Sequence, residues 1–301
     1  MVVTNPTHTR YTPMQKGNRL RQVRINGSNM RSDLIESCVA ASVSASMSSV
    51  TELKFTFADD HDAKLFRSGL FQDGHVVSFA HWKGRIKEGA RLKSARGGPQ
   101  VEVTAPSLFV ERLSGQTGER NWGETMITSW LRAQAESVGM LHDIENGIGA
   151  QKIVREKPDG DTAESTWDVM TEVAKENNCW LFEHSARLIV GRPGWVANRP
   201  WRTRMIIQLR WDSWGRYSGG LMGMPDFTPG PREEQKLKVR VTGDDAHRTC
   251  PGDTVVMSGN LNGGSSKMNA NGTWIVSDVN IPLNRAEGVD LDCIRATQGA
   301  F

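Results

Sequence analysis

The stretch Thr162-Ala-Glu-Ser-Thr-Trp-Asp-Val-Met-Thr-Glu-Val-Ala-Lys-Glu-Asn-Asn-Cys-Trp-Leu-Phe-Glu-His-Ser-Ala-Arg-Leu-Ile-Val-Gly-Arg-Pro193 predicts a capped amphipathic helix that runs directly into a two-stranded hairpin. Ser165 and Asp168 have nearly the spacing and chemistry of a capping box, and Thr162 with Glu164 offers a cap one turn earlier. The helix has an apolar and a polar face at helical spacing, formed by Trp167, Met170, Val173 and Ala174 and by Thr171, Glu172 and Lys175.

The predicted hairpin begins where Asn177-Asn178 ends this helix, because asparagine tolerates the left-handed backbone conformation that helix termination requires. Residues 179–182 and 187–190 are short runs of strand-forming side chains. Between them, residues 183–186 are expected to form the turn.

Several residues of this helix and hairpin occur in an order typical of one family. They are Thr166, Trp167, Val169, Val173, Ala174, Glu176, Asn178, Trp180, Phe182, Leu188, Gly191, Arg192 and Pro193. The segment resembles the corresponding part of the bacteriophage baseplate hub family, which includes the late-control-protein-D-like proteins of contractile tails.

Length and composition define the class of protein. A chain of 301 residues is long enough for two or three domains, and 24% charged with 38% hydrophobic residues is typical of an ordered, soluble protein. The net charge of +3 is too small to indicate nucleic-acid binding by the whole molecule. The sequence has no run of about 18 apolar residues and no signal-peptide core, so we expect folding in a cytoplasm and no stable membrane binding.

The amino-terminal segment is locally basic. Residues 1–31 contain no acidic side chain and six positive ones: Arg10, Lys16, Arg19, Arg21, Arg24 and Arg31. Such an arm can contact phosphates or an acidic partner. We favour the simpler interpretation, a solvated tail followed by a first strand whose outer face carries arginines.

The pattern along the chain predicts an α+β, mainly β protein with four parts: an extended arm at residues 1–17, a β-module at 18–112, an α+β insert at 113–199 and a second β-module at 200–301. The first module shows strand-like runs with turn signals at residues 20–25, 39–47, 49–57, 75–79 and 100–105. Only one short helix is expected there, near residues 59–66.

The insert is expected to contain a helix over residues 121–138, a strand at 151–154 and a turn at 157–160, before the helix and hairpin described above. The second module has predicted strands at residues 204–210, 235–241, 254–257, 274–279 and 289–294. Two Gly-rich segments are expected to be loops: residues 211–232, which would face a partner, and 263–272, a mobile tip.

The hub resemblance extends over nearly the whole chain. A carboxy-terminal signature is matched by Pro251, Gly252, Val255, Gly272, Trp274, Val276, Val279, Leu291, Cys293 and Arg295, and a looser amino-terminal match covers residues 52–60 and Gly74. The resemblance implies that both β-modules are tail-tube-like β-barrels flanking the α+β region. No cell-wall-cleaving or sugar-binding module is visible.

The family resemblance implies a structural role in assembly of the tail. Three copies would form a ring whose six barrels match a sixfold tail tube on one face, while the other face carries a threefold spike. The implied partners are further copies of the chain, the tube or distal tube protein, the spike, and the wedge and tape measure proteins. DNA would only pass through the lumen, and the protein would belong to the virion baseplate, assembled in the bacterial cytoplasm.

No residue is assigned a catalytic, cofactor or metal-binding role. His61 among Asp59, Asp60 and Asp62 is a possible metal cluster, but helix capping explains the carboxylates better. His75 and His81 would share a strand face and are interpreted as surface histidines.

Cysteines and glutamates were weighed as reactive groups. Cys38, Cys179, Cys250 and Cys293 show no zinc or redox spacing and are interpreted as buried small hydrophobes, although a Cys–His pair remains possible. Glu119, Glu124, Glu136 and Glu145 could in principle hydrolyse a glycoside, but solvated helix faces are the better interpretation. The alternative function is therefore a peptidoglycan hydrolase or sugar-binding β-protein of the tail tip.

Overall fold

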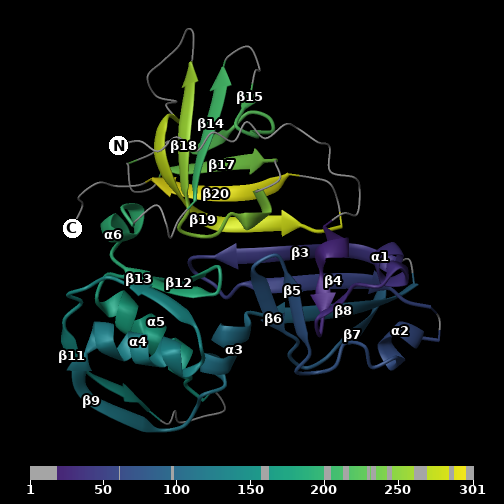
Figure 1. Cartoon of the computed structure of the whole chain (residues 1–301), viewed down its shortest axis with the longest axis horizontal. Helices are drawn as coiled ribbons and strands as arrows, with labels where there is room; N and C mark the ends of the chain where they lie inside the picture. The colour runs from purple at the N-terminus through teal and green to yellow at the C-terminus, as the bar shows by residue number, and fades with distance from the viewer. Residues whose placement is uncertain are drawn as a thin grey trace.

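The computed structural model describes residues 19–60, 62–95, 98–156, 163–199, 205–212, 217–228, 231, 235–242, 246–260, 270–284 and 288–295. Within these ranges the protein is mainly β, with short helices gathered chiefly in the middle of the sequence (Figure 1). The arm predicted at residues 1–17, the turn at 157–160 and most of the loop at 263–272 lie outside the described residues.

A single sheet joins the two ends of the chain. Within the described residues it has eleven strands, and its main path runs β15 (Tyr217–Ser218), β14 (Ile206–Asp212), β18 (Thr254–Asn260), β19 (Gly272–Pro282), β3 (Cys38–Ser46), β4 (Glu52–Ala58), β8 (Gly98–Pro106) and β7 (Arg91–Ala95). Its other three strands continue from β19 in the order β20 (Val289–Arg295), β17 (Lys236–Val241) and β16 (Asp226–Thr228). The two β-modules meet where β19 lies antiparallel to β3, as Figure 1 shows.

The amino-terminal module adds a second sheet over one face of this large sheet. Its four strands are ordered β2 (Ser28–Asn29), β1 (Arg24–Ile25), β5 (Val76–Phe79) and β6 (Trp82–Arg85). Along β4, Leu53, Phe55 and Phe57 alternate with more exposed residues, so one strand face is buried. Phe79 and Trp82 of the smaller sheet belong to the same hydrophobic core.

Two predictions for this module were wrong in detail. The run at residues 20–25 forms a 3₁₀ turn, η1 (Leu20–Gln22), and only a two-residue strand. Two helices are present instead of one, α1 (Ser32–Ser37) and α2 (Lys64–Arg67). Burial explains the difference, because Leu20 and Leu34 are core residues that anchor η1 and α1, an effect that strand-like alternation does not reveal.

The described arginines of the basic amino-terminal segment differ in their exposure to solvent. Arg21 and Arg24 are exposed, and Arg31 is exposed beside Asp33. Arg19 is buried and donates a hydrogen bond from Nη1 to the carbonyl of Pro282 at the end of β19. The predicted arginine-rich outer face is therefore wrong for Arg19, which contacts the carboxy-terminal module.

The middle region has its own core and two small sheets. Its helices are α3 (Leu108–Ser114), α4 (Ile127–Ser137), α5 (Thr166–Glu176) and α6 (Pro193–Ala197). Its strands form the sheets β10 (Leu141–Ile144)–β13 (Arg187–Gly191)–β12 (Trp180–His184) and β9 (Arg120–Met126)–β11 (Ala150–Arg155). Figure 1 places this region beside both β-modules, with α3 next to β6 of the amino-terminal module.

The helix and hairpin that opened the sequence interpretation are confirmed as α5, β12 and β13. Ser165 and Asp168 form a complete capping box, in which each side chain accepts a hydrogen bond from the other residue's backbone N–H. The turn is tighter than predicted: only Ser185 and Ala186 have positive φ, and His184 already pairs with Arg187 across the strands.

The helix predicted at residues 121–138 was wrong in its first part. Residues up to Met126 form β9, and α4 begins at Ile127. Asn121 bends this strand, because its side-chain oxygen accepts a hydrogen bond from the N–H of Gly123, which has φ +70°. Pairing with β11 outweighs the helical spacing of Trp122 and Met126.

The described part of the loop predicted at residues 211–232 is also more ordered than expected. It contains β15 and β16, and Leu221 is buried. The N–H of Met222 donates to the Arg240 carbonyl, and the N–H of Thr242 donates to that of Gly220. This segment therefore touches β14 through β15 on one side and β17 on the other.

The two predicted barrels are not confirmed, since no sheet closes on itself among the described residues. One hydrophobic core runs through both β-modules, from Leu20 to Cys293, while a separate cluster from Leu113 to Val190 fills the middle region. The domain boundaries stay predictions. No described helix has the length and apolar character needed to cross a membrane.

Candidate functional site

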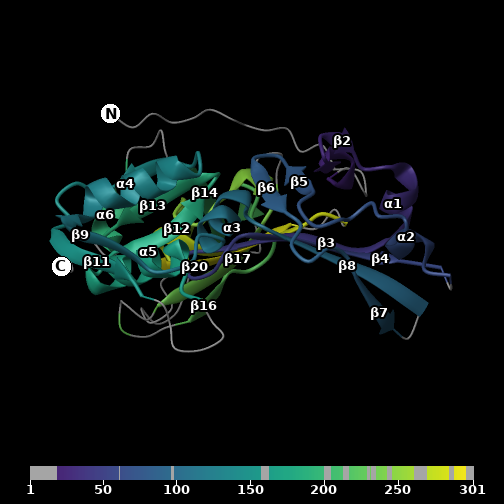
Figure 2. The ribbon, with the colours of Figure 1, turned by 90° about the horizontal axis from the view of Figure 1, so that it is seen from below.

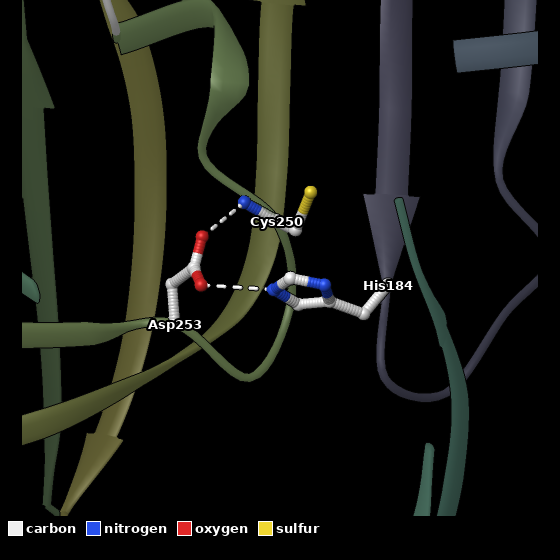
Figure 3. A group of neighbouring side chains, drawn as sticks. All are labelled: His184, Cys250 and Asp253. Atoms are coloured by element: carbon white, nitrogen blue, oxygen red, sulfur yellow. Dashed lines mark hydrogen bonds and ion pairs between the residues drawn. The ribbon is translucent and has the colours of Figure 1, made fainter. Parts of the chain in front are cut away.

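Three segments that are far apart in sequence bring polar side chains together where the middle region meets the β-modules. His184 lies at the end of β12, and Cys250 and Asp253 lie in the turn before β18, as Figure 3 shows. The possible ligand atoms of these three residues lie within 4.8 Å of one another. His81, between β5 and β6, places Nε2 3.2 Å from Cys250 Sγ.

The Cys250-Pro251-Gly252-Asp253 turn is fixed by backbone hydrogen bonds. The N–H of Asp253 donates to the Cys250 carbonyl. Two further bonds join the turn to β19: the N–H of Gly252 donates to the Val276 carbonyl, and the N–H of Val276 donates to the Asp253 carbonyl. Gly252 has φ +84°, a conformation that residues with a Cβ rarely adopt. The turn therefore presents Cys250 and Asp253 on one side.

Asp253 is the centre of the cluster and is fully buried. Its Oδ2 accepts a 2.7 Å hydrogen bond from the N–H of Cys250, and its Oδ1 accepts one of 2.7 Å from the N–H of Met205. His184 Nε2 lies 2.9 Å from the same Oδ1. Because three groups hold the carboxylate, its orientation is fixed before any ligand arrives.

The electrostatics of Cys250 argue against a reactive thiolate. Burial, with added repulsion from Asp253 and Glu183, raises the pKa of the Cys250 thiol well above its ordinary value. An activated nucleophilic cysteine needs the opposite shift. The cluster does bring a cysteine and histidines together, yet it lacks the electropositive environment of a cysteine hydrolase.

His81 and Glu183 are also affected by burial. Burial lowers the pKa of His81 to about 4, and the neighbouring His184 and His247 act in the same direction. Burial raises the pKa of Glu183 to about 7, opposed by the hydroxyl groups of Ser107 and Thr51. Burial thus shifts both groups toward their neutral forms, and His81 offers an imidazole nitrogen lone pair at neutral pH. The surface interpretation of His81 was wrong.

The other sequence candidates lie elsewhere. His61 is outside the described residues. Asp59 caps α2 by accepting hydrogen bonds from the N–H groups of Leu65 and Phe66, and Asp60 accepts one from Lys64, so the capping interpretation of these two carboxylates is confirmed. His75 Nδ1 contacts the Leu70 carbonyl instead of the cluster.

The four glutamates weighed for glycoside hydrolysis are chiefly surface residues. Glu119, Glu124 and Glu136 are exposed, and Glu136 contacts His142 at 3.0 Å. Glu145 is half-buried, where it accepts a hydrogen bond from the Arg192 N–H and pairs with the Arg192 guanidinium. The arginine of the Gly-Arg-Pro motif thus joins β13 to the end of β10.

Sequence reasoning missed the cluster because its members are widely separated. The only local signal is the pair Cys250 and Asp253 around Pro251-Gly252, since three-residue spacing across a tight turn brings two side chains together. Nothing in the sequence indicates that His184 and His81 meet this turn.

The fold is similar to that of several solved structures, although no protein-family model matches the chain and no curated protein matches it in sequence. It is similar to the tail protein of Neisseria meningitidis MC58, with a TM-score of 0.55 and 12% identity over 90% of this chain and 94% of that one. It is also similar to the 43 kDa tail protein of prophage MuSo2 from Shewanella oneidensis, with a TM-score of 0.53 and 9% identity over 91% and 98% of the two chains. The chain shares the fold of phage tail proteins.

A third similar structure comes from a secretion machine. The E. coli c3393 protein is a component of the type VI secretion system with structural similarity to the T4 bacteriophage tail proteins gp27 and gp5. It matches with a TM-score of 0.57 and 10% identity over 92% of this chain and 77% of that one. The common fold therefore occurs in tail proteins and in a component of a type VI secretion system.

Proposed function

We propose that this protein is a structural component of a phage tail or related injection machine, and specifically its baseplate hub. The observation that carries the proposal is the fold likeness to two tail proteins, which covers at least nine-tenths of this chain and of each of those chains. A likeness of this extent includes both β-modules and the middle region, so it involves the whole architecture and not one common motif.

In this proposal, three copies form a ring that adapts a sixfold tail tube to a threefold central spike. Each copy contributes two β-modules, and their joining through β3 and β19 supports the idea of two tube-like units in one rigid chain. A head-to-tail interface that closes after three copies gives cyclic symmetry. DNA would pass through the lumen without a specific site.

The ends of the large sheet are the proposed contacts between copies. β7 is an edge strand that projects from the body of the protein in Figure 2, and Leu92 on it is 46% exposed. Near the other end, Met222 and Met224 are also exposed. Unpaired sheet edges with apolar side chains are suited to strand pairing with a neighbour.

The proposed partners follow from this position in a tail. They are further copies of this chain, the tube or distal tube protein, the central spike, and the wedge and tape measure proteins. The protein would function without catalysis in the virion baseplate, after assembly in the host cytoplasm. Both contractile and non-contractile machines are compatible with the proposal.

The oligomeric state of the purified protein tests the hub proposal. Light scattering after size-exclusion chromatography should give three times the 33.3 kDa monomer mass, alone or after addition of a spike protein from the same machine. Leu92→Asp should reduce the trimer fraction strongly, whereas Leu141→Asp, at an exposed position in the middle region, should leave it unchanged. A monomer under both conditions would overturn the hub proposal.

A turbidity assay on purified peptidoglycan tests the alternative, a cell-wall hydrolase. We expect no clearing, because Glu119, Glu124 and Glu136 are exposed surface residues and burial raises the pKa of the Cys250 thiol. Clearing by the pure protein would contradict a purely structural role.

A further inference from the structure

We propose that Cys250, His184 and Asp253 bind a divalent transition-metal ion, with zinc as the best fit, and that this ion fastens the middle region to the carboxy-terminal β-module. The proposal rests on the positions of the cysteine sulfur, an imidazole nitrogen and a carboxylate oxygen from two distant segments, all within 4.8 Å of one another. It is independent of the tail function proposed above.

The distances suit a tetrahedral ion. At Zn–N and Zn–S distances of about 2.1 and 2.3 Å, ligand atoms lie about 3.3–3.6 Å apart. His184 Nε2 and Asp253 Oδ1 are already 2.9 Å apart. Small side-chain rotations would bring Cys250 Sγ to the same spacing, and the His184–Asp253 contact would become two metal–ligand bonds.

The carboxylate ligand is positioned in advance. The N–H groups of Cys250 and Met205 hold its two oxygens, and the turn that carries it is bound to β19 through Val276. Outer hydrogen bonds of this kind orient metal ligands and raise affinity. A metal ion would therefore meet a carboxylate that is already held in place.

His81 is placed to complete the coordination. Its Nε2 is 3.2 Å from Cys250 Sγ, so one metal ion could contact both atoms. A set of one sulfur, two imidazoles and one carboxylate would give four protein ligands. Closed four-ligand zinc sites are structural, whereas catalytic sites keep one position for water.

The ligand types select the class of metal. Thiolate and imidazole favour zinc and its first-row neighbours over magnesium and calcium, which prefer oxygen ligands. Asp253 is fully buried and Cys250 is 1% exposed, so charge on them needs compensation within the protein. A dication bound by one thiolate and one carboxylate has no net charge, which suits this buried position.

The location gives the ion a structural role. His184 belongs to the middle region, Cys250 and Asp253 to the last module, and His81 to the first. One ion would thus cross-link three segments whose relative positions otherwise depend on packing and hydrogen bonds. Because the unfolded chain has no preformed site, binding energy would add to folding stability.

The test uses untagged full-length protein expressed with zinc, because a polyhistidine tag would bind metal itself. Elemental analysis by mass spectrometry should find about one zinc per chain. After removal by a chelator, zinc in hundredfold excess over its Kd should raise the Tm by about 5 °C. Cobalt should replace zinc and give a thiolate-to-cobalt charge-transfer band.

Two matched pairs of variants locate the site. Cys250→Ala should lose the zinc and the cobalt band, whereas Cys293→Ala, which removes an equally buried thiol on β20, should keep both. His184→Gln should weaken zinc binding at least tenfold, whereas His75→Gln, outside the cluster, should not. If Cys250→Ala fails to fold, the thiolate-to-cobalt charge-transfer band of the wild-type protein shows whether a cysteine binds the metal.

Two results would overturn the proposal. One is wild-type protein that contains no zinc, shows no Tm shift with zinc and gives no charge-transfer band with cobalt. The other is an unchanged zinc content in folded Cys250→Ala protein, because the ion would then be bound elsewhere.

Discussion

Gly252 lies against the ring of Phe182 so closely that a Cβ atom on Gly252 would be 2.6 Å from Phe182 Cζ. The glycine belongs to the Pro-Gly turn before β18, and the phenylalanine belongs to β12 of the middle region. Two segments that carry the hub resemblance therefore pack directly on each other. This contact holds the turn that supplies Cys250 and Asp253.

Gly252→Ala should destabilise the protein by about 2–4 kcal/mol, because the new methyl group overlaps the Phe182 ring and alanine is strained at φ +84°. Denaturant unfolding followed by circular dichroism measures the loss. Gly149→Ala is the control, since its Cβ would meet no atom within 4 Å. Equal stability of the two variants would contradict the packing described.

Ser165→Ala should lower the free energy of unfolding by about 1 kcal/mol, because it removes the Ser165 hydroxyl from the α5 capping box. Thr171→Ala on the exposed face of the same helix should change the free energy of unfolding by less than about 0.5 kcal/mol. Thermal unfolding of both variants provides the comparison. A loss at position 171 as large as that at 165 would show that the cap is not the cause.

Val43→Ala and Ile281→Ala should be energetically coupled. These residues are paired across β3 and β19 and are fully buried. Each substitution should lower the free energy of unfolding by about 2–4 kcal/mol. The loss in the double variant should differ from the sum of the two single losses by at least about 0.5 kcal/mol. Val43→Ala combined with Val173→Ala, in the separate middle core, should be additive. Additivity in both pairs would refute a shared core across the modules.

Cys38 should react slowly with iodoacetamide at pH 8 in the native protein. Burial raises the pKa of its thiol to about 11, so the thiolate fraction is on the order of a hundredfold lower than for an ordinary cysteine. The rate should rise about tenfold per pH unit up to pH 11, because only the thiolate reacts. Peptide mapping measures the rate of Cys38 alkylation, with Cys38→Ser as the control. A rate that levels off near pH 9 would contradict the raised pKa.

Local chemistry explains which elements could be predicted from sequence. The α5 cap, its apolar face and the following hairpin depend on neighbours within about four residues, so their pattern is complete in the chain. At residues 121–126 the same kind of reasoning failed. There, pairing with β11 decides the conformation, and that partner lies some thirty residues away in sequence.

The candidate site could not be predicted for the same reason. His184 and Asp253 are 69 positions apart, and His81 and Cys250 are 169 apart. Each residue alone fits an ordinary core or surface position. These four side chains form one cluster only because β12 packs against the turn that contains Gly252.

The pairing of β3 with β19 has a consequence during protein synthesis. β3 (Cys38–Ser46) is synthesised well over 200 residues before β19 (Gly272–Pro282), so one edge of β3 has no partner during that interval. At about 5–20 residues per second, the delay is tens of seconds. The large sheet therefore stays incomplete during synthesis until β19 has been made.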